Sequence, residues 1–181
     1  MSDFRPLFLI AMPQLLDPNF SRSVVLILDH DREGAMGLVV NHPLAMNLGD
    51  FALQEKMLCH GALQKTSVFK GGPVETDRGW VLHTDDSVEE RKEIMPGLYL
   101  STSSDSLKKL LENGSQPLRL ILGYAGWAAG QLESEMKLGS WLTFQANPKD
   151  VLETDPSRTW TTVLRSMGVD PMQLISVRGV H

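Results

Sequence analysis

The chain has 181 residues, of which 42% are hydrophobic and 22% charged, a composition typical of a globular protein with a sizeable core. Seventeen basic and 22 acidic side chains give a net charge of −5, which argues against a surface that follows nucleic-acid phosphates. The only cysteine, Cys59, excludes an internal disulfide and fits a reducing compartment.

The N-terminal apolar run, Leu7–Met12, closes at Pro13. It is too short for the core of a signal peptide and far too short to span a bilayer. We therefore expect a cytoplasmic protein without membrane contact, with a single domain over residues 1–181.

Apolar and β-branched stretches in the first part of the chain predict three strands. They cover residues 7–12, 23–28 and 36–40. The last two should form an antiparallel hairpin, because the link between them is far too short for a crossover helix. This link, Asp29–Gly34, opens like a calcium-binding loop, but Val40 stands where the bidentate glutamate is needed. We predict a plain turn there.

Further along the chain, helix and strand signals alternate. A helix capped by Asn47 is predicted over residues 48–58, and others run from Ser103 or Ser104 to Gly114, over 127–137, and from Asp155-Pro156 to Gly168. Strands are predicted over residues 66–70, 80–83, 98–101, 118–122 and 141–144. The polar segment 84–97 is predicted to be an exposed, mobile loop. The pattern indicates an α+β protein with a mixed sheet.

Two glycine-rich segments, 71–83 and 122–133, are the most distinctive part of the sequence. A strand followed by glycines and a helix start can bind anions. However, the spacing of Gly123, Gly126 and Gly130 fits neither the dinucleotide nor the Walker pattern. We therefore interpret these glycines as allowing close strand–helix packing around Trp127, with an anion site as the alternative.

Side chains capable of chemistry are scattered along the sequence, and no spacing indicates a metal site or a cofactor. His83 is interpreted as a hydrogen-bonded structural histidine, although its titration range leaves a catalytic role open. Glu133 is expected on the solvated surface, with a buried acid near the glycine turn as the alternative. Cys59 is expected to be a small buried apolar residue, and the four tryptophans are expected in the core.

Several blocks together resemble the AlgH/YqgE family in order over nearly the whole chain. They are Ala11-Met12-Pro13 with Ser23–Val25, Met36–Asn41, Gly71–Val74 with Leu82-His83, Gly123–Trp127, Gly130–Glu133 and Trp141-Leu142. The tail Val177–His181 departs from the ending that is usual in the family. The resemblance implies a bacterial cytoplasmic protein whose mixed, bifurcated sheet curls into a pseudo-barrel with helices packed outside. The family is often described as a candidate transcriptional regulator linked to alginate control, with no agreed activity or cofactor.

These observations give two functional hypotheses. The first is a non-catalytic regulatory or binding module that acts through an unidentified protein partner. The second is an enzyme or a binder of small molecules or anions, with a pocket near the Gly126-Trp127 turn. Direct nucleic-acid binding ranks last, because no helix-turn-helix pattern with basic residues is present. The candidate binding surface comprises Asn41, Gly71, Gly72, Pro73, His83, Tyr124, Gly126, Trp127 and Glu133.

Overall fold

The computed structural model describes residues 6–176, so the tail Val177–His181 lies outside the described residues. Within this range the chain forms ten strands, six α-helices and one 3-10 helix. The strands are β1 (Leu7–Ala11), β2 (Val24–Asp31), β3 (Gly34–Val39), β4 (Pro43–Asn47), β5 (Ser67–Lys70), β6 (Val74–His83), β7 (Lys92–Met95), β8 (Leu98–Ser101), β9 (Leu118–Ala128) and β10 (Trp141–Gln145). The helices are α1 (Leu48–Gln54), the 3-10 helix η1 (Gly61–Leu63), α2 (Ser104–Asn113), α3 (Gln131–Lys137), α4 (Pro148–Leu152), α5 (Pro156–Ser166) and α6 (Pro171–Ser176).

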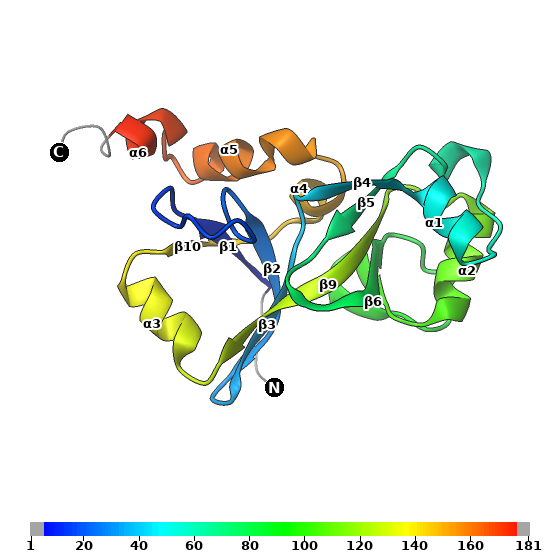
Figure 1. The fold of residues 1–181 in the computed structure, drawn as a ribbon, viewed down its shortest axis with the longest axis horizontal. Helices are drawn as coiled ribbons and strands as arrows, with labels where there is room; N and C mark the ends of the chain where they lie inside the picture. Colours follow the sequence, from blue (N-terminus) through cyan, green and yellow to red (C-terminus); the bar gives the residue numbers. More distant parts are fainter. Residues whose placement is uncertain (1–5, 177–181) are drawn as a thin grey trace.

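The strands form one curled sheet in the order β10-β1-β2-β3-β9-β6-β8-β7, with β4 and β5 branching from β9. The β5–β9 pair is parallel and the other pairs are antiparallel, so the sheet is mixed. The two parts of the sheet diverge from β3 and β9, with α1 and α2 beside one part, α3 and α5 on opposite sides of the other, and α4 between the two parts (Figure 1). The α+β fold with a mixed, bifurcated sheet, expected from the family resemblance, is confirmed.

Strand β9 belongs to both parts of the sheet. Its first half lies between β5 and β6, and its second half, from Ala125, pairs with β3. At the change of partner, Gly123 has a φ of +76°. The register between β6 and β9 also shifts there, between Val74 and Gly79. A bulge of this kind bends a strand without ending it.

The alternation of side chains along the strands divides the interior into three apolar clusters. Trp160 and Leu164 of α5 cover one face of β1–β3, whereas Leu132 of α3 covers the opposite face. The helices α1 and α2 cover the third cluster, around Val81 and Leu120. All four tryptophans are at most 6% exposed, which confirms their prediction as core residues.

One buried charge connects the sheet to the C-terminal helices. The Arg119 guanidinium, on β9, donates to the carbonyls of Val40 at 2.6 Å and Thr154 at 2.8 Å. It also lies 4.6 Å from the centre of the Phe69 ring. Burial lowers the pKa of Arg119 to about 10. The side chain thus joins three separate stretches of the chain through hydrogen bonds to main-chain oxygens.

The predicted strands all fall on observed strands, and the hairpin of β2 and β3 is confirmed. The helix predicted over 127–137 was wrong at its start, because residues up to Ala128 extend β9 by pairing with β3 and the helix begins at Gln131. Strand β6 begins at Val74 instead of residue 80, and α1 ends at Gln54 instead of residue 58. The elements β4, β7, η1, α4 and α6 were not predicted.

The segment 84–97, predicted to be an exposed loop, is instead held by specific contacts. It contains β7, and Val88 is 1% exposed. The carboxylate of Glu90 accepts hydrogen bonds from the main-chain N–H groups of Thr102 and Ser103, at the start of α2. The polar groups of this segment make hydrogen bonds within the protein. A hydropathy pattern does not distinguish such groups from groups that are hydrated by solvent.

Candidate functional site

The two glycine-rich segments meet in space through their main chains. The N–H of Gly71 donates to the carbonyl of Leu122 at 2.8 Å. A β-carbon on Gly72 would overlap the carbonyl group of Tyr124. Because main chain fills this contact, these glycines act through the close approach of two main-chain segments, and not through the strand–helix packing around Trp127 that the sequence predicted.

The candidate Asn41 is 7% exposed and serves the main chain of β2. Its Oδ1 accepts from the N–H of Val24 at 2.9 Å, and its Nδ2 donates to the carbonyl of Arg22 at 3.0 Å. The Asn41 side chain therefore supplies hydrogen-bond partners to main-chain groups at the start of β2 that would otherwise have none.

The candidate His83 is fully buried, and both of its ring nitrogens make hydrogen bonds. The N–H of Asp85 donates to Nδ1 at 3.2 Å, so the proton of the neutral ring lies on Nε2. Nε2 then donates to Oγ of Ser101 at 2.8 Å, and this hydroxyl donates to the carbonyl of Glu90 at 2.6 Å. Burial lowers the pKa of His83, which keeps the ring neutral. This geometry agrees with the interpretation of His83 as a hydrogen-bonded structural histidine.

Trp127 is held by a residue that the sequence reasoning missed. Oε2 of Glu135, on α3, accepts hydrogen bonds from Nε1 of Trp127 at 3.0 Å and from Nε1 of Trp141 at 2.8 Å. The two indole rings lie edge to face, with centres 5.9 Å apart, and Phe20 packs against both. Glu135 thus fixes α3 against β9 and β10.

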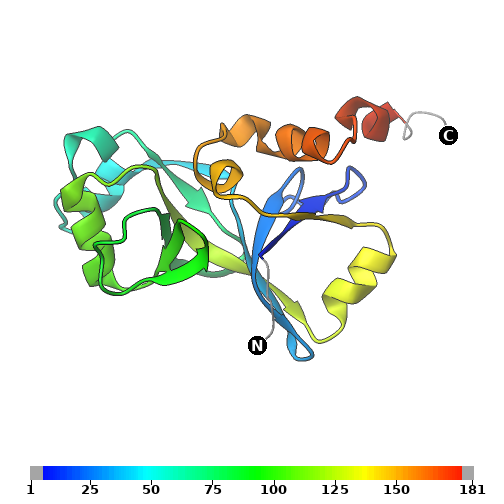
Figure 2. The same cartoon turned by 180° about the vertical axis from the view of Figure 1, so that it is seen from behind.

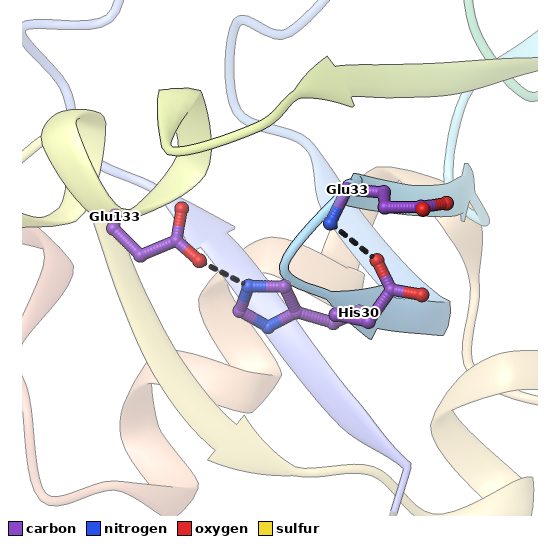
Figure 3. Close-up of polar contacts among 4 residues, drawn as sticks. His30, Glu33 and Glu133 are labelled. Atoms are coloured by element: carbon purple, nitrogen blue, oxygen red, sulfur yellow. Dashed lines mark hydrogen bonds and ion pairs between the residues drawn. The ribbon is translucent and has the colours of Figure 1, made fainter.

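The candidate Glu133 forms an exposed pair with His30. Nε2 of His30 lies 2.6 Å from Oε1 of Glu133, and the two side chains are 34% and 47% exposed (Figure 3). The hydrogen bond from His30 lowers the pKa of Glu133. Glu133 is therefore a surface residue, as the sequence predicted.

A bulge in β2 brings this pair together. The register between β2 and β3 shifts between Ile27 and Asp29, after which His30 lies opposite Ala35. Ala35 packs on the face of the sheet that α3 covers, so His30 lies on the same face as Glu133. Bulges commonly re-aim side chains in this way.

The tip of the hairpin beside this pair is acidic. Asp29, Asp31 and Glu33 line a shallow cavity of about 240 Å³ together with Gly34, Ala35, Met36 and Trp127. At the turn, the N–H of Glu33 donates to Oδ1 of Asp31 at 2.7 Å (Figure 3). This confirms the plain turn predicted for the link. The carboxylates of this hairpin tip would repel an anion in the cavity beside Trp127.

The remaining candidates share no single cavity with these groups. Tyr124 stacks edge to face on Trp80, with ring centres 6.1 Å apart, and Pro73 and Gly126 are exposed. Asn41, His83 and Glu133 have separate hydrogen-bond partners and do not converge. The structure therefore brings together the glycine segments, and separately Glu133 with His30, but not the nine residues as one surface.

Cys59 is half-buried instead of buried as predicted, and burial raises the pKa of its thiol. It lines a cavity of about 470 Å³ beside α1. Among residues 6–176, no group of three or more His, Cys, Asp and Glu side chains is placed to hold a metal ion. None of the helices described in this range combines the length and apolarity needed to cross a membrane.

The fold and the motif positions match a family of bacterial proteins. Residues 8–172 match the model of the AlgH-like family, and the chain belongs to this family. A UPF0301 protein of Myxococcus xanthus is 48% identical over 181 residues and is covered fully, as is this chain. A UPF0301 protein of Vibrio cholerae is 38% identical, with 95% of this chain and 96% of the relative covered.

Two solved structures share the fold. The solution structure of the AlgH protein from Pseudomonas aeruginosa aligns with a TM-score of 0.76 and 35% identity, covering 100% of this chain and 96% of that one. The crystal structure of protein DIP2367 from Corynebacterium diphtheriae aligns with a TM-score of 0.72 and 22% identity, covering 91% and 88%. The names of these relatives state no molecular activity.

Proposed function

We propose that this protein is a non-catalytic regulatory or binding module of the cytoplasm that acts through a protein partner. The proposed contact surface comprises the β2–β3 hairpin tip and the adjoining face of α3, with His30 and Glu133 at its centre. Of the polar candidate residues, Asn41 and His83 use their hydrogen-bonding groups inside the protein. The exposed His30–Glu133 pair is the observation that carries the proposal.

The charge of this surface indicates the chemistry of the partner. Asp29, Asp31, Glu33 and Glu133 are all exposed and outnumber the two cations of the same surface, Arg32 and Lys137, and the whole chain carries a net charge of −5. Such a surface attracts a basic partner and speeds its association, more strongly at low salt. A protein that presents lysines or arginines fits this requirement, whereas a nucleic acid does not.

Zero-length crosslinking tests the proposal, because carbodiimide joins a carboxylate directly to a lysine in contact with it. We expect the protein to crosslink to a partner in extract of cells that express it. The variant Glu133→Gln and the triple variant Asp29→Asn, Asp31→Asn, Glu33→Gln should each reduce the crosslinked product. Glu112→Gln is the matched control, since Glu112 is an exposed carboxylate on α2, far along the chain from the hairpin. Equal products from all four proteins would contradict the proposal.

The alternative is a small-molecule site in the cavity beside Trp127. The acidic lining favours a cationic ligand over the anion that the glycine pattern suggested. A ligand of the native state must raise the melting temperature. A thermal-shift panel of polyamines, amino acids, nucleotides and phosphorylated metabolites separates the hypotheses. A rise that Asp31→Asn abolishes would favour the small-molecule site over the protein partner.

A further inference from the structure

The outer edge of β10 is a second surface that can bind a protein segment. β10 ends the sheet and pairs with β1 alone among the described residues. In the view of Figure 2, β10 runs across the near side of the molecule, and neither helix nor strand is drawn in front of it. The edge strand therefore presents its main chain outward.

The alternation of hydrogen bonds between β1 and β10 shows which main-chain groups of β10 are not bonded to β1. The N–H of Ala146 donates to the carbonyl of Pro6 at 3.1 Å, and the N–H of Met12 donates to the carbonyl of Ser140 at 2.9 Å. Because bonded and outward-facing residues alternate in an antiparallel ladder, the even-numbered residues of β10 bond to β1. The N–H and C=O groups that point outward belong to Trp141, Thr143 and Gln145.

This edge lacks the features that usually protect a sheet edge. Strand β7, at the other end of the sheet, is four residues long and carries Lys92 and Glu93. Strand β4 begins with Pro43 and pairs irregularly with β5. Strand β10 has neither a charge nor a proline, and its register with β1 is regular over five residues. Charges, prolines and bulges are the devices by which proteins block pairing at an edge, so β10 is open to pairing.

An apolar cavity lies at the C-terminal end of this edge. It has a volume of about 410 Å³ and includes Gln145 of β10 in its lining. The apolar residues of its lining are Pro6, Ile94, Met95, Pro96, Ala146 and Pro148. None of the lining residues is charged, so a buried charge would find no partner there. The cavity is large enough for one bulky apolar side chain.

We propose that the β10 edge binds an extended, uncharged segment of a partner protein as an additional strand, with one bulky apolar side chain seated in this cavity. The main-chain groups of Thr143 and Gln145 supply the hydrogen bonds, and the cavity selects the side chain. This inference rests on the proposed function in taking the partner to be a protein. It uses a different surface from the hairpin tip, so the two can fail separately.

Synthetic peptides test the proposal on the full chain. The probes are fluorescent peptides of about nine residues with alternating threonine and valine and a lysine at each end. The central residue is phenylalanine, leucine, alanine or glutamate. The phenylalanine and leucine peptides should bind at least about tenfold more tightly than the alanine peptide, because they bury apolar surface in the cavity. The glutamate peptide should not bind.

A pair of variants at one position tests the strand pairing itself. Thr143→Pro removes an outward N–H that β1 does not use, so this edge position tolerates the change. It should weaken peptide binding about tenfold or more, whereas Thr143→Val keeps the N–H and should change binding less than about threefold. Hydrogen exchange at Thr143 and Gln145 should slow when the phenylalanine peptide is bound. Circular dichroism melting checks that both variants are folded.

Any of the following results would overturn the proposal. The first is equal affinity of wild type and Thr143→Pro, and the second is no preference among the central residues. The third is an edge already occupied by other chain segments. A dimer that Thr143→Pro dissociates, without peptide binding, would show a second copy on the edge, and binding only after deletion of residues 1–5 would show the chain's own N-terminus there. Peptide failure with intact Glu133-dependent crosslinking would refute this inference and leave the proposed function standing.

Discussion

The carboxylate of Glu135 should make a large contribution to stability, and its removal is the sharpest test of the α3 region. It accepts hydrogen bonds from the indole N–H groups of Trp127 and Trp141, which are 6% and 4% exposed as whole residues. The variant Glu135→Ala leaves both donors without this partner. A buried donor without a partner costs about 1–3 kcal/mol, and these bonds are only partly buried, so we expect a loss of roughly 2–4 kcal/mol.

The melting temperature provides the assay. For a chain of this size, each kcal/mol corresponds to about 2–4 °C, so Glu135→Ala should lower the melting temperature by roughly 4–16 °C. The control is Glu133→Ala, two positions earlier on the same helix, where the pair with His30 is exposed to solvent and should contribute little to stability. Calorimetry or circular dichroism measures both. Equal losses from the two variants would refute the assignment of Glu135 as the anchor of the tryptophans.

Three further changes follow from the buried contacts. Asn41→Ala leaves the N–H of Val24 without its acceptor and should destabilise the protein by about 1–3 kcal/mol in urea unfolding, and a loss below about 0.5 kcal/mol would contradict that role. Gly72→Ala should cost more than Gly97→Ala, because a β-carbon at Gly72 meets main chain while Gly97 faces open space, so equal unfolding midpoints would exclude close approach as the reason for Gly72. Burial lowers the pKa of His83 from 6.5, so the unfolded state takes up a proton first and stability present above about pH 6.5 is lost as the pH falls below it. The variant His83→Gln should flatten this dependence between about pH 7 and 5, and an unchanged slope would show that His83 is not its source.

The sequence predicted the elements whose signal is local. The β2–β3 hairpin follows from two apolar runs and a link too short for a helix, and α5 follows from the Asp155 cap and Pro156 at its first position. The end of β9 was mispredicted, because Gly123 and Gly126 look like a break in isolation. Pairing of Ala125–Ala128 with β3 overrides that local preference.

The candidate site was harder to predict because its contacts are distant in sequence. His30 and Glu133 are 103 positions apart, and they meet only because of the bulge in β2. No local sequence pattern around Glu135 predicts its role as a hydrogen-bond acceptor, because that role depends on where Trp127 and Trp141 lie in space. The glycine segments were recognised as distinctive, but their mutual contact depends on the parallel pairing of β5 with β9.

The shared strand β9 should govern how the protein unfolds. Its first half is hydrogen-bonded to β5 and β6, and its second half to β3, through one uninterrupted main chain. Loss of β9 from either half therefore removes a central partner from the other. Slow amide hydrogens on β2 and on β6 should consequently exchange with the same free energy, through one cooperative opening of the whole sheet.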